Sequence, residues 1–235
     1  MANGGPARRR RRPAPSRTPS PKARRTAAVA REQPAPPVPT EPFRLGVVPG
    51  STPGKWVDAW QARRPNPLQL VPLAVREQRT ALDAGDVDAA IVRQPIARDG
   101  LHVIPLYDEV TVVVVPADSH LTAADELTPE DLAGEVVLTP ADDVLGMPLP
   151  AGAVAGSSAP PESTRDAIEL VAANVGVVIV PMSLARLHHR RDVAHRPLAG
   201  APSSSVALAW PAERTTPDVD AFVGIVRGRT VNSSR

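Results

Sequence analysis

The chain has 235 residues, no cysteine and only six aromatic side chains. That length allows one domain of ordinary size or two small lobes. The absence of cysteine excludes disulfides, thiolate zinc sites, iron–sulfur ligation and cysteine nucleophiles. A core with so few rings must be built from Val, Leu, Ile and Ala, and no apolar run approaches the roughly 20 residues of a membrane-spanning helix.

Charge is divided unevenly along the chain. The formal net charge is +2, but residues 1–43 carry +8 and the remaining residues carry −6. An acidic body is not typical of a nucleic-acid-binding domain, so non-specific contact with phosphates is expected only from the basic segment. The arginines predicted to make that contact are Arg8, Arg9, Arg10, Arg11, Arg12, Arg24 and Arg25.

Residues 1–42 are predicted to be a disordered Arg/Pro-rich tail. They hold ten of the 29 prolines and show no apolar periodicity. A charged start is present, but the apolar stretch of a secretory signal is missing, so a cytoplasmic location is expected. The alternative to phosphate contact is a solvated terminus without a partner.

Strands and helices alternate from Phe43 onward. Strands are predicted at 43–48, 68–73 and 87–92, with a helix from Pro53 to the residues before Pro65 and another at 75–84. Thr52 is the expected N-cap of the first helix, and Gly85 the C-terminal stop of the second. This order predicts a parallel sheet with right-handed crossovers.

The second half continues with strands and four further helical segments. A short helix begins at Thr128. Ser163 is predicted to cap a helix that ends near Asn174, with Asp166 at the capping-box position. A short helix at 184–187 and a final one carrying Val219, Phe222, Val223 and Val226 on one face complete the helices. Strands are expected at 101–107, 110–115, 136–138, 177–180, 193–198 and 206–210, with room for a short one near Val154.

Polar side chains gather at the carboxyl ends of these strands. Ligands of open α/β sheets bind there, beside helix starts that favour anions. A small carboxylate is therefore the expected ligand, with Arg93 as its bidentate partner. The predicted ligand-binding residues are Ser51, Thr52, Arg93, Gln94, Thr139, Ser163 and Thr164.

Each of these residues also has a plainer interpretation. Thr52 and Ser163 could serve only as N-caps, and Arg93 could pair with Asp88 or Asp99 at the surface. Trp56 and Trp60, four residues apart, either pack into the core or form a dimer surface.

Catalysis is not indicated. The chain has no HExxH spacing, no G-x-S-x-G and no phosphate-binding glycine motif, and adjacent histidines such as His188 and His189 point about 100° apart on a helix. No metal, no cofactor and no enzymatic activity are therefore expected.

Four stretches together resemble the effector-binding domain of LysR-type transcriptional regulators. They are FRLGVVPGSTPGKWVDAWQARRPNPLQLVPL, LDAGDVDAAIV, VTVVVVPADSHLTAADELTPEDLAGEVVL and AIELVAANVGVVIVPMSLA. The resemblance implies a two-lobed α/β fold of the type 2 periplasmic-binding-protein kind over residues 43–230. It also implies lobes at about 43–110 with 205–230 and at about 111–204, an effector site between them, and pairing of two domains through the helix that carries Trp56.

The chain departs from that family at its N-terminal side. The family places a winged helix-turn-helix before this domain, whereas a basic tail stands there in this sequence, so a stand-alone domain is expected. The leading hypothesis is a non-enzymatic effector-binding protein that acts on transcription through its tail or a partner, as a homodimer or with a related regulator. The alternatives are a transporter's solute-binding protein and a mixed-dimer partner of full-length regulators.

Overall fold

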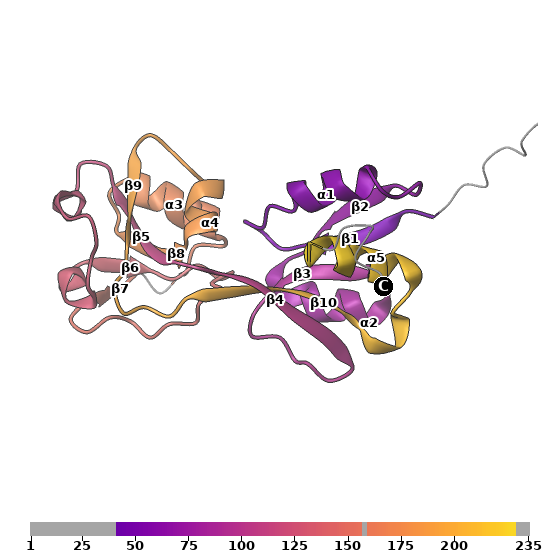
Figure 1. Ribbon diagram of the computed structural model, residues 1–235. Helices are drawn as coiled ribbons and strands as arrows, with labels where there is room; N and C mark the ends of the chain where they lie inside the picture. Colours follow the sequence, from indigo (N-terminus) through magenta and orange to yellow (C-terminus); the bar gives the residue numbers. More distant parts are fainter. Residues whose placement is uncertain (1–40, 157–158, 229–235) are drawn as a thin grey trace, which may run out of the picture. The chain divides into compact units, whose positions relative to one another are not determined.

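The computed structural model describes residues 41–156 and 159–228. The predicted tail arginines and the predicted disorder of residues 1–40 lie outside the described residues. The described residues form two five-stranded sheets, each with helices on it, which are the two lobes of the expected fold (Figure 1). Within these residues, no helix is long and apolar enough to cross a membrane.

The first lobe contains a mixed sheet in the order β2-β1-β3-β10-β4. Strand β1 pairs in parallel with β2 and β3, as the strand–helix alternation predicts. Strand β10 lies antiparallel between β3 and β4. The strands are β1 (Phe43–Val47), β2 (Leu68–Pro72), β3 (Ala89–Arg93), β4 (Leu101–Glu109) and β10 (Ser204–Pro211). The helices are α1 (Gly54–Gln61), α2 (Gln78–Ala84) and α5 (Pro217–Val226).

The second lobe has the strand order β7-β6-β8-β5-β9. Strand β5 is buried along its whole length, as the run VTVVVV predicts for a central strand. The strands are β5 (Thr111–Pro116), β6 (Val136–Leu138), β7 (Val154–Ala155), β8 (Val177–Pro181) and β9 (Val193–Pro197). The helices are α3 (Thr164–Ala172) and α4 (Met182–Leu187). The chain passes between the lobes at the β4–β5 and β9–β10 connections.

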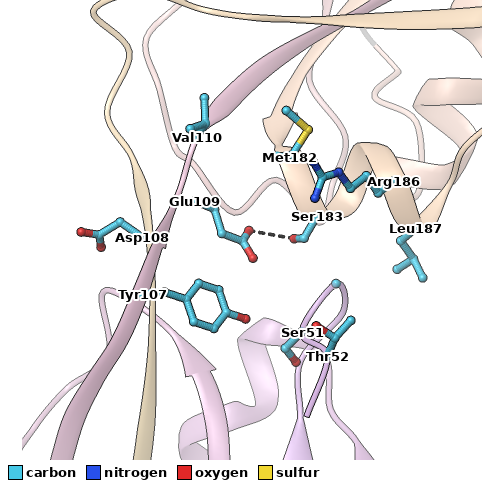
Figure 2. Close-up of a pocket in the computed structure, with 11 residues that line it drawn as sticks. Ser51, Thr52, Tyr107, Asp108, Glu109, Val110, Met182, Ser183, Arg186 and Leu187 are labelled. Atoms are coloured by element: carbon cyan, nitrogen blue, oxygen red, sulfur yellow. Dashed lines mark hydrogen bonds between the residues drawn. The ribbon is translucent and has the colours of Figure 1, made fainter. Parts of the chain in front are cut away.

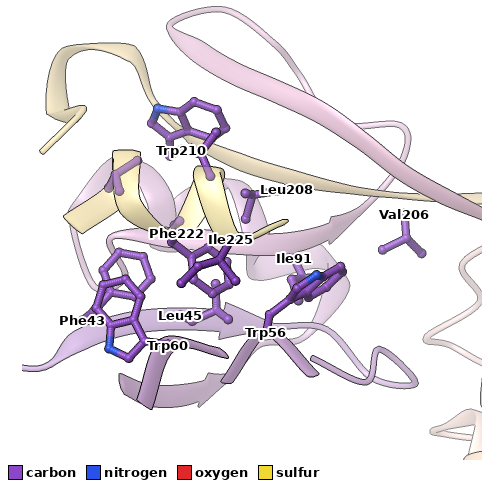
Figure 3. Packing of buried hydrophobic residues seen from close by; sticks show 13 residues of the cluster. Phe43, Leu45, Trp56, Trp60, Ile91, Val206, Leu208, Trp210, Phe222 and Ile225 are labelled. Atoms are coloured by element: carbon purple, nitrogen blue, oxygen red, sulfur yellow. The ribbon is translucent and has the colours of Figure 1, made fainter. Parts of the chain in front are cut away.

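Each central strand sends alternate side chains to two different cores. On β3, Ile91 packs in a cluster with the aromatic rings of α1 and α5, whereas Val92 packs in a cluster with α2 (Figure 3). On β5, Val112 and Val113 likewise enter opposite clusters. This period of two is the geometry of a strand covered on both faces. Both faces of each sheet are therefore covered by apolar clusters.

One local prediction is wrong, a second is refined, and the choice between core and dimer surface for the two tryptophans is decided. Helix α1 begins at Gly54 with Pro53 as its N-cap, and no side chain caps it, so Thr52 is not the cap. The predicted helix at 75–84 is a 3-10 turn, Val75–Glu77, followed by α2. Trp60 is fully buried against Phe43, and Trp56 is also buried, so these indoles pack in the core and do not form a dimer surface.

Candidate functional site

A cavity of about 610 Å³ lies where the turn after β1, the end of β4 and the start of α4 meet (Figure 2). The first two elements belong to the first lobe and α4 to the second, so both lobes line the cavity. The lining residues are Gly50, Ser51, Thr52, Tyr107, Asp108, Glu109, Val110, Met182, Ser183, Arg186 and Leu187.

The turn after β1 contributes two hydroxyls to the cavity. Gly50 has a φ of 83°, and a Cβ there would collide with the Ser183 side chain, so the turn needs glycine to approach α4. The Ser51 hydroxyl donates to the Val48 carbonyl at 2.6 Å. The exposed Thr52 hydroxyl has no hydrogen bond to any residue that the structure describes.

Arg93 lies behind the cavity wall, with only 1% of its side chain exposed. Its Nη1 donates to Glu109 Oε2 at 3.0 Å and to Ser204 Oγ at 2.8 Å. Its Nη2 donates to Ser183 Oγ at 2.9 Å and to the Pro49 carbonyl at 3.2 Å. The guanidinium is therefore occupied by groups of the protein, and it pairs with Glu109 instead of Asp88 or Asp99.

Ser183 links this ion pair to the second lobe. Its hydroxyl accepts from Arg93 and donates to Glu109 Oε2 at 2.7 Å. Because Ser183 lies in the first turn of α4 and Arg93 at the end of β3, these bonds join the two lobes beside the cavity.

Arg186 is the one cationic side chain that lines the cavity. Arg186 lies on α4 one turn after Ser183 and is exposed, and its side chain forms no hydrogen bond or ion pair with any described residue. The acidic residues Glu109 and Asp108 line the cavity as well, and of the two, Glu109 turns its carboxylate toward it (Figure 2).

The other predicted site residues lie outside this cavity. Gln94 is half-buried, and its backbone N–H donates to the Ser205 carbonyl at 2.9 Å. Thr139 follows β6 and lines two smaller cavities of about 50 and 380 Å³. Ser163 caps α3 as predicted, and Thr164 is buried and donates to Asp142 at 2.9 Å. The structure thus brings together Ser51 and Thr52, with Arg93 behind them.

Four lining residues were missed by sequence reasoning: Tyr107, Glu109, Ser183 and Arg186. The i, i+3 spacing of Ser183 and Arg186 on one short helix directly after the strand VVIVP was a usable signal. No sequence signal points to Glu109, because its contact with Arg93 depends on the position of β10 between β3 and β4.

The wall that carries Tyr107 has a negative electrostatic character. Burial raises the pKa of the Tyr107 phenol above its ordinary value, and the Glu109 carboxylate raises it further. Arg93 lowers this pKa, but by less than Glu109 raises it. The carboxylate therefore outweighs its guanidinium partner at the phenol.

The histidines do not form a metal centre. Among the residues that the structure describes, no group of three His, Asp or Glu side chains is placed to hold a metal ion. Burial lowers the pKa of both His188 and His195, and Arg186 lowers that of His195 further.

Known proteins resemble this chain in sequence over the residues that form both lobes. The LysR substrate binding domain family matches residues 38–230. The chain is 27% identical over 186 residues to the Hca operon transcriptional activator HcaR of Escherichia coli K12, covering 74% of this chain and 62% of HcaR. It is 30% identical over 159 residues to the transcriptional regulator MetR of the same strain, covering 64% of this chain and 50% of MetR. The chain thus spans about half to three-fifths of these relatives.

Solved structures share the fold. The BenM effector binding domain with its effector benzoate has a TM-score of 0.65 at 19% identity, covering 81% of this chain and 95% of that one. The reduced OxyR regulatory domain of Pseudomonas aeruginosa has a TM-score of 0.63 at 22% identity, covering 80% and 96%. The family match covers most of the chain, both sheets and the cavity between them. This chain belongs to the LysR substrate-binding domain family.

Proposed function

We propose that this protein is a non-enzymatic effector-binding protein whose cavity takes a small carboxylate. The observation that carries the proposal is Arg186, which borders the cavity without an ion-pair partner in the described chain. Ser51 and Thr52 border the same cavity from the other lobe. The Ser51 hydroxyl donates to the Val48 carbonyl, so in the described chain the Thr52 hydroxyl is the one that is free to donate. A carboxylate held between the guanidinium and the Thr52 hydroxyl would gain charge-assisted hydrogen bonds from both lobes.

In this proposal Arg186 takes the role that the sequence suggested for Arg93. Arg93 already donates four hydrogen bonds to groups of the protein, one of them to the Glu109 carboxylate. Its contribution is to hold Glu109 and Ser183 in place at the cavity wall.

The proposed biological role is transcription regulation in the cytoplasm. The transcriptional regulators HcaR and MetR favour this role over that of a transporter's solute-binding protein. Pairing with a second copy or with a related regulator is part of the proposal. Trp56 and Trp60 are buried in the core, so their side chains cannot supply that interface.

The test is a thermal-shift screen of small carboxylates with matched arginine variants. A carboxylate present at about 100 times its dissociation constant should stabilise the wild-type protein by about 2.7 kcal/mol. Arg186→Gln and Thr52→Val should remove most of that response. Arg190→Gln, which changes an exposed arginine paired with Asp192 at 2.8 Å, should leave it intact. Responses that survive both cavity variants would place the binding site elsewhere and refute the proposal.

A further inference from the structure

The cavity presents opposite chemical character on its two sides. Figure 2 shows Glu109 and Tyr107 on one side, and Arg186 with the Ser51–Thr52 turn on the other. The second side suits a carboxylate, as proposed above. The first side needs a partner of different chemistry, because a carboxylate placed there would meet another carboxylate.

Glu109 has acceptor capacity that the protein leaves unused. Only 9% of its side chain is exposed, and its Oε2 accepts from Arg93 and Ser183. Its Oε1 accepts no hydrogen bond from the described residues, yet it is not among the fully buried polar atoms that lack a partner. A carboxylate accepts at about four positions, so Oε1 is an open acceptor at the cavity wall.

A cationic donor would satisfy the Glu109 Oε1 acceptor better than a neutral one, because charge-assisted hydrogen bonds are shorter and stronger. The same carboxylate acts on Tyr107, whose pKa is raised first by burial and then by Glu109, with Arg93 opposing both. Asp108, the residue before Glu109 on β4, turns its carboxylate away from the cavity and accepts from the Ser205 hydroxyl at 2.5 Å, so Glu109 is the carboxylate that faces a ligand (Figure 2). Arg93 neutralises Glu109 through Oε2, but a ligand that brought only a carboxylate would leave Oε1 without a donor in a partly dehydrated site.

Three apolar side chains complete the lining. Val110 and Leu187 are each 54% exposed, and Met182 lines the cavity with them. Apolar groups left open in a cavity of about 610 Å³ are what an apolar portion of a ligand would cover.

We propose that the effector is an amino acid with an apolar side chain, its carboxylate on Arg186 and the Ser51–Thr52 turn and its ammonium on Glu109. This inference rests on the proposed function, since it identifies the class of carboxylate. The ammonium donates to Glu109 Oε1 and to the oxygen of Tyr107, while the side chain covers Val110, Met182 and Leu187. Arg93 and Ser183 position Glu109 for this contact.

The test compares matched ligands by calorimetry on the wild-type chain. Each apolar proteinogenic amino acid is paired with the acid that lacks the amine and with the amine that lacks the carboxylate. One such set is L-leucine, 4-methylpentanoate and isoamylamine. The best amino acid should bind at least about tenfold more tightly than its deaminated acid, because a charge-assisted hydrogen bond is lost with the amine. This comparison needs no variant.

Variants then test whether Glu109 causes the preference for an amino acid over its deaminated acid. Glu109→Gln should remove the preference for the amino acid, whereas the deaminated acid should still bind. Because this change leaves the buried Arg93 without its carboxylate, the melting temperature of the ligand-free variant is measured beside the wild-type chain, and the ratio of the two affinities within the folded variant is the readout. Glu130→Gln, an exposed change in the 3-10 turn Pro129–Leu132, should change neither affinity.

The outcomes separate the two proposals. A deaminated acid that binds as tightly as its amino acid, and loses binding in Arg186→Gln, would overturn the zwitterion inference and leave the carboxylate site standing. If no amino acid and no deaminated acid binds, both proposals fail. An amino-acid preference that persists in Glu109→Gln would show that Glu109 is not the ammonium partner.

Discussion

Arg93 and Glu109 form a buried ion pair, and their burial determines whether a substitution at either residue can test ligand binding. Transfer of such charges from water costs several kcal/mol per ion and is offset only by close pairing and added hydrogen bonds. Ser183, Ser204 and Pro49 supply those bonds, although Arg93 Nε stays without a partner in the described chain. Substituting Arg93 would leave Glu109 buried and unpaired, so lost binding could not be separated from lost stability. The exposed Arg186 is the informative position.

The electrostatic effect of Glu109 can be measured through Tyr107, which is the single tyrosine of the chain. The pKa of its phenol is raised from 10.0 by burial and by Glu109. Because a nearby carboxylate disfavours the phenolate, Glu109→Gln should lower this pKa. Tyrosinate absorbance during an alkaline titration of the folded protein reports the change directly. Identical titrations of the wild-type chain and Glu109→Gln would contradict the negative wall, and Glu130→Gln supplies the matched control.

At the scale of the element, the sequence predicts individual strands and helices but not the contacts between segments that are distant in the chain. The continuous apolar run Val110–Val115 and the helical spacing around Ile168 predict a strand and a helix that the structure contains. Asn174 was expected to tolerate a left-handed conformation, and its φ is 57°. Arg93 and Ser183 are 90 residues apart, and their contact depends on how two lobes meet, which no periodicity records. The site was therefore half-predicted: Ser51 and Thr52 are local to one turn, whereas Glu109 and Arg186 are brought there by topology.

Two hydroxyl residues that precede helices differ in their structural roles, and stability measurements can separate them. The Ser163 hydroxyl accepts from the Asp166 N–H at 3.2 Å and donates to the Asp166 carboxylate at 2.7 Å, closing the first turn of α3. Ser163→Ala should therefore lower the free energy of unfolding by about 1 kcal/mol. Thr52→Ala, which removes no capping bond from α1, should change it by less than about 0.5 kcal/mol. Urea denaturation measures both, and an equal loss in the two variants would contradict the assignment of the cap.

At the scale of the whole molecule, the sequence separates a basic segment from an acidic remainder. Residues 1–43 carry a net charge of +8 and the rest carry −6. The proposed effector contacts, Thr52, Glu109 and Arg186, all lie in the acidic part, where Ser183 hydrogen-bonds Arg93 and Glu109 across the two lobes. Effector binding and any contact with nucleic acid are therefore expected to depend on different segments of the chain.

This separation of charge predicts how the protein binds nucleic acid. The arginines of the basic segment, Arg8 to Arg12 with Arg24 and Arg25, should bind duplex DNA weakly, on the order of 10⁻⁴–10⁻⁶ M at physiological salt, and without sequence preference. If roughly six cations contact phosphates, the plot of log K against log[salt] should have a slope of about −5, because each contact releases condensed counterions.

Removal of residues 1–40 should abolish that binding and leave the melting temperature and the effector response of the remainder unchanged. Fluorescence anisotropy of labelled duplexes across a salt series measures the slope, and thermal shift with a bound effector measures the rest. Tight, sequence-selective binding by the shortened chain would contradict this assignment, because the acidic lobes would then hold a recognition surface of their own. Absence of binding by the intact chain at low salt would leave the basic segment without a phosphate role and favour regulation through a partner protein.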